Sequence, residues 1–81
     1  MLNPNELIEK AGRLASQRTV GKALFGTLDD GTQFYIHREA AQTLEKYRQV
    51  NLGDQVTVWG YPGGVNNTYL KVEEIEFVPA V

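Results

Sequence analysis

The stretch from Val50 to Tyr61 constrains the fold more than any other part of this 81-residue sequence. After a Gly-Asp turn its side chains alternate, with Val56, Val58 and Gly60 in one phase and Thr57, Trp59 and Tyr61 in the other. Successive side chains of a strand point to opposite faces, so one phase packs on a core and the other faces water or a partner. The second phase carries two large rings, which is more apolar area than a solvent face needs. The stretch therefore predicts a half-buried strand with a candidate binding surface.

The start of the chain has the pattern of a helix. Asn3 is a capping residue, Pro4 suits the first helical position, and Glu6 lies where a capping box places its acid. The apolar residues then recur at helical spacing, at Leu7, Ile8, Ala11, Leu14 and Ala15. We therefore expect a helix over residues 3–17.

Four strands and a second helix are expected after it. Strands are predicted over 19–28, 32–37 and from the Gly53-Asp54 turn to Tyr61, and a last strand over 68–78. Asp29-Asp30-Gly31 is a hairpin turn, and the residues from Pro62 to Asn67 form a loop. Helical spacing returns at 38–48, with Ala40, Ala41, Leu44 and Tyr47 as its apolar positions.

Two features of these strands indicate curvature. Gly21 and Gly26 interrupt the first strand, as expected of the bends in small barrels. In the last strand, Leu70 and Val72 are one residue out of step with Ile75 and Phe77, which a bulge at Glu73-Glu74 would correct. The fold class is therefore mainly β: one domain over 1–81, with an N-terminal helix and an OB-like or SH3-like barrel over 19–78 that contains the inserted helix 38–48.

A family resemblance supports this architecture over residues 21–61. The segments Asp30-Gly31, Phe34-Tyr35-Ile36-His37-Arg38 and Leu52-Gly53-Asp54-Gln55-Val56-Thr57-Val58 resemble the S1 and cold-shock branch of the OB fold. The resemblance implies a barrel that binds single-stranded nucleic acid. An OB barrel has five strands and we count four here, unless the segment 19–28 bends to serve two sheets.

Composition narrows the function classes. The chain has no cysteine, which excludes disulfides and thiolate metal sites, and its net charge of -2 argues against a strongly basic nucleic-acid binder. Seven of the eight Lys and Arg residues fall between Lys10 and Arg48, and folding could gather or scatter them. No signal peptide or membrane span is recognisable, so a cytoplasmic location is expected.

Catalysis has little support in the sequence. His37 is the one histidine, so neither a histidine dyad nor a histidine metal site can form, and we expect no metal, no cofactor and no enzymatic activity. A small nuclease centred on His37, beside Arg38, is the enzymatic alternative.

Binding has more support, because rings and cations interleave on the phase away from the core. Phe25 shares this phase, and the residues predicted to contact nucleic acid are Lys22, Tyr35, His37, Arg38, Trp59, Tyr61, Tyr69 and Lys71. If the barrel has four strands, the loops beside this binding face are residues 29–31 and 62–67. The predicted partner is single-stranded RNA or DNA, with RNA preferred. The alternative is a protein-interaction module, an adaptor or a homodimer, that uses the same rings or an edge strand.

Overall fold

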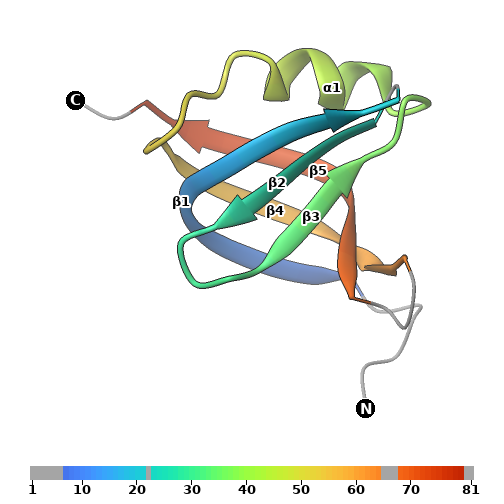
Figure 1. Ribbon diagram of the computed structural model, residues 1–81, viewed down its shortest axis with the longest axis horizontal. Helices are drawn as coiled ribbons and strands as arrows, with labels where there is room; N and C mark the ends of the chain where they lie inside the picture. Colours follow the sequence, from blue (N-terminus) through green and yellow to red (C-terminus); the bar gives the residue numbers. More distant parts are fainter. Residues whose placement is uncertain (1–6, 22, 65–67, 80–81) are drawn as a thin grey trace.

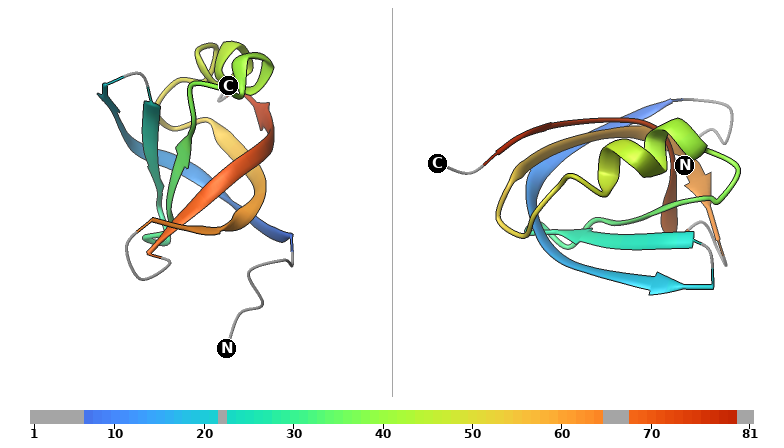
Figure 2. Two further views of the ribbon diagram at one scale, coloured as in Figure 1. Left: turned by 90° about the vertical axis from the view of Figure 1, so that its right-hand side faces the viewer. Right: turned by 90° about the horizontal axis from the view of Figure 1, so that it is seen from above.

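Five β-strands and one short helix make up the part of the chain that the computed structural model describes, residues 7–21, 23–64 and 68–79. In chain order they are β1 (Ile8–Val20), β2 (Ala23–Leu28), β3 (Gln33–Ile36), α1 (Ala41–Tyr47), β4 (Gln55–Gly63) and β5 (Tyr69–Val78). Figures 1 and 2 show the strands wrapped into a barrel with α1 across one end. Among these residues, no helix is long and apolar enough to cross a membrane.

The sheet closes on itself in the order β1-β2-β3-β5-β4. The long strand β1 makes the closure possible, because its first half, Ile8 to Arg13, pairs with β4 and its second half, Leu14 to Val20, pairs with β2. A bulge between Leu14 and Ser16 separates the two halves. All neighbouring strands are antiparallel except β3 and β5, which run parallel.

The predicted N-terminal helix is wrong over residues 8–17, which belong to β1. Of its apolar stripe, only Leu14 is fully buried, Ile8 is half-buried, and Ala11 and Ala15 are exposed. Each half of β1 pairs with a neighbouring strand, and this pairing outweighs the local helical pattern. The proposed helix start, Asn3 to Glu6, lies outside the described residues.

The count of four strands is also wrong. The predicted strand 19–28 is the end of one strand and the whole of the next, divided at Gly21, where φ is 62°. The Asp29–Gly31 hairpin turn is confirmed, but it joins β2 to β3, so it is not the loop after the first strand. Part of the predicted loop 62–67 is strand as well, since Pro62 and Gly63 pair with β5, and residues 65–67 are not described.

The alternation predicted for the middle of the chain is confirmed. Phe34 and Ile36 from β3 and Val56 and Val58 from β4 are fully buried. The inserted helix is shorter than predicted and spans Ala41–Tyr47. Its buried residues Leu44 and Tyr47 close the end of the barrel, where the Tyr47 ring meets the Phe34 ring edge-on at 5.6 Å between centroids.

The predicted bulge in the last strand is confirmed. Trp59 pairs with Glu74 but Gly60 pairs with Val72, which leaves Glu73 as the extra residue. The bulge lets Leu70, Val72 and Ile75 all face the core. Here the two backbones approach so closely that a Cβ on Gly60 would lie 2.1 Å from the carbonyl oxygen of Lys71.

Candidate nucleic-acid interface

A row of rings and cations crosses the outer surface of the barrel. Each member lies opposite the next on a neighbouring strand, one from each of the five strands, in the order Arg18, Phe25, Tyr35, Lys71 and Tyr61. All five side chains are at least partly exposed. We call this set the cross-strand row. It forms because the strand register aligns residues that are far apart in the sequence.

Three rings at the centre of this surface touch one another. The rings of Phe25 and Tyr35 are stacked, with centroids 5.6 Å apart and planes 28° from parallel. Tyr69, at the start of β5, meets Phe25 edge-on at 5.5 Å and Tyr35 at 6.3 Å. The guanidinium of Arg18 lies 5.3 Å from the centre of the Phe25 ring, within cation–π range. The result is an apolar platform with a positive charge over one of its rings.

A glycine keeps the backbone of β4 close to this platform. A Cβ on Gly63 would lie 3.0 Å from the Tyr35 hydroxyl and 3.4 Å from the Cβ of Lys71. The side chains of Tyr35 and Lys71 therefore rest against bare backbone, which narrows the positions that they can adopt.

A hollow of about 380 Å³ lies beside the platform, which we call the side hollow. Its walls come from the second half of β1, from β2 and from Gln33 and Tyr69. Ser16, Thr27 and Gln33 are neighbours across three strands here, and they supply two hydroxyls and an amide next to the rings. The side hollow thus pairs flat apolar surface with hydrogen-bonding groups.

The structure brings together four of the eight predicted site residues, namely Tyr35, Tyr61, Tyr69 and Lys71. His37 is close to them, because it lines a small hollow with Lys71 and Glu73, and its Nδ1 accepts a hydrogen bond of 3.3 Å from the backbone N–H of Glu39. Arg38 is exposed in the turn that follows and is not part of the row. Lys22 lies outside the described residues.

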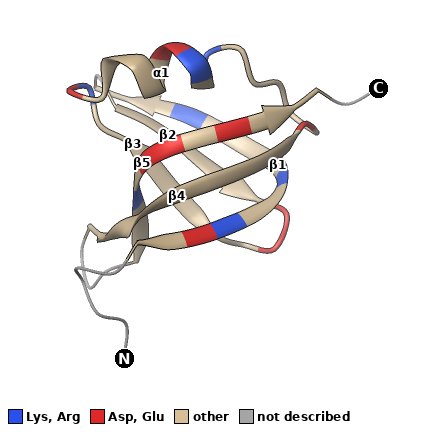
Figure 3. Cartoon of the chain, turned by 180° about the vertical axis from the view of Figure 1, so that it is seen from behind, with Lys and Arg blue, Asp and Glu red and all other residues tan. Residues whose placement is uncertain are grey.

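Trp59 lies apart from the platform of Phe25, Tyr35 and Tyr69. Its indole N–H donates a 2.8 Å hydrogen bond to the Glu9 carboxylate, and its partner on β5 is Glu74. Figure 3 shows acidic residues along β5 and near the start of β1 on this side of the barrel. Two carboxylates thus flank the one tryptophan, and a phosphate would be repelled there.

The basic residues that the structure describes do not gather into a single patch. Arg18 and Lys71 belong to the cross-strand row, whereas Lys46 is paired with Glu76 at 2.6 Å and Arg48 lies 3.6 Å from Glu45. Within the described residues, no group of three His, Asp or Glu side chains could hold a metal ion.

Three residues of this surface were absent from the predicted site, namely Arg18, Phe25 and Gln33. Arg18 was placed at the junction of a supposed helix and strand, so no face could be assigned to it. Phe25 did carry a usable signal, since its phase was opposite that of the core residues Leu24 and Leu28. Gln33 carried the same signal as Tyr35 and His37, since all three lie in the phase opposite to Phe34 and Ile36, and its place beside Thr27 became evident only from the strand register.

Comparison with known proteins places the chain beside part of a larger enzyme. No protein-family profile matches the sequence. Lysine–tRNA ligases of Burkholderia vietnamiensis and Burkholderia ambifaria are 34% identical to it in an alignment of 76 residues that covers 88% of this chain and 15% of each enzyme. The chain thus spans about 15% of the length of these curated relatives.

A solved structure has the same fold. A chain in the structure of OBody AM1L10 bound to hen egg-white lysozyme superposes with a TM-score of 0.81 at 16% sequence identity. The match covers 96% of this chain and 87% of that chain. At this level of identity the likeness concerns the fold alone.

Proposed function

We propose that this chain is a non-enzymatic OB-type barrel that binds single-stranded RNA on its cross-strand row. The observation that carries the proposal is the contact among Phe25, Tyr35 and Tyr69 on an outer surface, bracketed by Arg18 and Lys71. OB barrels bind nucleic acid on the face of strands 2 and 3, which is where Phe25 and Tyr35 lie. The five-stranded ring with a helix between β3 and β4 supports this assignment of the barrel.

The chemistry of the row suits an unpaired strand. Bases of any sequence can stack on exposed rings, at about 1–3 kcal/mol per base, while cations at the edge meet the phosphates. Arg18 and Lys71 lie on either side of the Phe25–Tyr35 pair, so bases that stack at the centre keep their phosphates within reach of both charges.

Two observations favour RNA over DNA. Ser16, Thr27 and Gln33 line up beside the rings, and such groups can exchange hydrogen bonds with a ribose 2′-hydroxyl. The relatives that share 34% identity with the chain are ligases whose substrate is a tRNA.

The net charge of -2 is compatible with this function because of where the acids lie. Glu9 is on β1, and Glu74 and Glu76 are on β5. These acids lie around Trp59, away from Phe25 and Tyr35. Binding should therefore be moderate in strength and sensitive to salt.

The test is binding of a fluorescently labelled, mixed-sequence RNA of about 12 nucleotides, within the range of site sizes for OB folds. Anisotropy is measured at about 50 mM and about 200 mM salt, the range in which phosphate contacts weaken. Tyr35→Ala should weaken binding, whereas Trp59→Phe, on the acidic side, should leave it within about twofold. Saturable, salt-sensitive binding with this difference supports the proposal. No binding at low salt, or equal effects of the two substitutions, would overturn it and favour a protein partner.

A further inference from the structure

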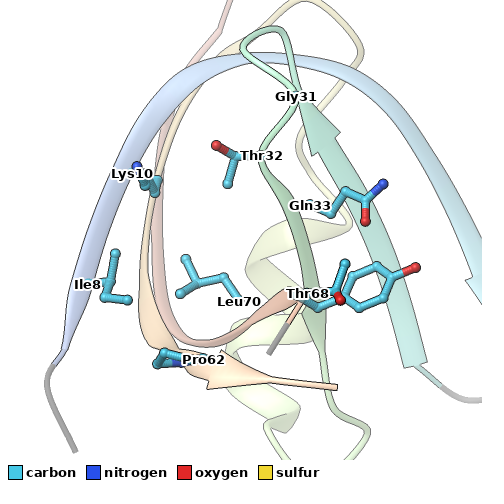
Figure 4. Close-up of a pocket in the computed structure, with 9 residues that line it drawn as sticks. Ile8, Lys10, Gly31, Thr32, Gln33, Pro62, Thr68 and Leu70 are labelled. Atoms are coloured by element: carbon cyan, nitrogen blue, oxygen red, sulfur yellow. The ribbon is translucent and has the colours of Figure 1, made fainter. Parts of the chain in front are cut away.

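The two ends of the barrel are closed differently. Helix α1 lies across one end (Figure 1), and its residues Leu44 and Tyr47 are buried there. The opposite end holds a hollow of about 490 Å³, which we call the barrel mouth and which Figure 4 shows in close-up. This volume is within the range of small-molecule sites.

The walls of the barrel mouth combine apolar floor and polar rim. Ile8, Pro62 and Leu70 supply aliphatic surface, and Leu70 is 6% exposed. Thr32 stands opposite Lys10 across the floor, and Gln33 lies on the same side as Thr32 with its amide directed away from Lys10 (Figure 4). A flat ring with polar edges fits such walls, because its faces meet carbon and its edges meet a hydroxyl group and a cation.

The barrel mouth adjoins the side hollow. Gln33 and Tyr69 line both of them. Tyr69 also touches Phe25 and Tyr35, so the wall of the barrel mouth is part of the same ring cluster. A strand that stacks on these rings would therefore lie next to the mouth.

The charged residues at the rim determine which ligand charge the mouth favours. Lys10 is the cation among the lining residues, and its charge acts on the carboxylate of Asp30 in the β2–β3 turn. Hydrogen bonds from Thr32, together with Lys10, hold the pKa of Asp30 below its usual value, so this carboxylate stays charged at neutral pH. A phosphate at Lys10 must compete with Asp30.

We propose that the barrel mouth is a site for one nucleotide, with its base on the Leu70 floor beside Tyr69 and its phosphate toward Lys10. The same chemistry has two sources, a free nucleoside monophosphate or the end nucleotide of a bound RNA strand. The second source rests on the proposed function, and the first does not.

The experiment is an NMR titration of the isotope-labelled protein with three probes: adenosine, adenosine monophosphate and the RNA used above. Reporters of the barrel mouth are the methyl groups of Ile8 and Leu70 and the amides of Thr32 and Gln33, and the amides of Phe25 and Tyr35 report on the row. Lys10→Gln removes the cation. Asp30→Asn removes the competing charge but keeps an oxygen that accepts the 2.8 Å hydrogen bond from Thr32. Lys46→Gln, in the exposed pair with Glu76, is the matched control.

We expect adenosine monophosphate to shift the mouth reporters and to bind more tightly than adenosine. Lys10→Gln should weaken the monophosphate by about twofold to fivefold, as expected for one exposed ion pair, and Asp30→Asn should strengthen it. Neither should change the affinity for adenosine, and Lys46→Gln should change nothing. If the free nucleotide does not shift the NMR signals of the mouth reporters and the RNA does, the occupant is the end nucleotide of the RNA strand.

Two results would overturn the proposal. One is that neither the monophosphate nor the RNA shifts the mouth reporters. The other is that Lys10→Gln and Lys46→Gln have equal effects. The two proposals fail separately: RNA that shifts only Phe25 and Tyr35 leaves the RNA-binding proposal standing without the mouth. If the monophosphate binds in the mouth but the protein binds no RNA, the nucleotide site stands and the RNA-binding proposal fails.

Discussion

Phe25 and Tyr35 lie directly opposite each other on β2 and β3, and their rings stack with centroids 5.6 Å apart. The Tyr69 ring meets Phe25 edge-on, and Arg18 lies over the Phe25 ring. Such a pair presents aromatic surface on which a base can stack. The experimental expectations for RNA binding follow from this geometry.

Replacement of Phe25 by Leu should weaken RNA binding at least about fivefold, since it keeps apolar area but removes a stacking face worth about 1–3 kcal/mol per base. The measurement is anisotropy with the same labelled RNA. Phe77→Leu is the matched control, because Phe77 is half-buried on β5 and makes none of these ring contacts. Equal losses in the two variants would contradict a role for the Phe25 ring.

Replacement of Lys71 by Gln should reduce the salt dependence of RNA binding. Each phosphate contact on a single strand contributes about 0.7 to the slope of log affinity against log salt, so the slope should become shallower by about that amount. Lys46→Gln should leave the slope unchanged, because Lys46 is paired with Glu76 on α1 and β5. A slope unaffected by Lys71→Gln would mean that this lysine meets no phosphate.

Replacement of Gly60 by Ala should lower the free energy of unfolding by about 2 kcal/mol or more. The new methyl would overlap the backbone of Lys71, which cannot move without distorting the bulge, and overpacking of this kind typically costs about 1–3 kcal/mol. Urea denaturation measures the change. Thr57→Ala, half-buried on the outer side of the same strand, serves as the reference and should stay within about 1 kcal/mol. A Gly60→Ala protein as stable as this reference would contradict the close approach.

The stability of the barrel should fall above pH 10 because of Tyr47. Burial raises its pKa from 10.0 to about 12, so the folded chain keeps a proton that the unfolded chain loses. The contribution is fully present below pH 10 and is lost as the pH rises toward 12, at up to about 1.4 kcal/mol per pH unit. Urea denaturation at several pH values, compared with Tyr47→Phe, isolates this residue from the other titrating groups. Parallel pH profiles for the two proteins would show that Tyr47 is not the cause.

The alternating strands could be predicted from the sequence because burial on one face imposes its own period. Val56, Val58, Phe34 and Ile36 show this clearly, and the bulge at Glu73 was visible as a one-residue slip in the same pattern. β1 could not be predicted this way. It pairs along both edges yet buries one large side chain, Leu14, so its sequence records little of the contacts that hold it.

The candidate site was partly predictable for a related reason. Tyr35, Tyr61, Tyr69 and Lys71 were found because their phase sets them off from core residues on the same strands. Which of them meet depends on register between strands, and that separated Trp59 from the cluster and added Arg18 to it. The side chains that share the side hollow could not be inferred until β1 and β2 were known to be two strands.

Barrel closure through β1 bears on how the chain folds. The β1–β2 and β2–β3 pairings join neighbouring segments, whereas the pairing of Ile8 with Gly60 and of Arg13 with Gln55 requires most of the chain to be in place. Contacts between such distant segments carry a large entropic cost before they return any stabilisation, and chains rich in them fold slowly. The joining of β1 to β4 should therefore be the late step. Until it occurs, the open edges of both strands are free to pair with another molecule, so a slow-folding population at high concentration is the stage most exposed to aggregation.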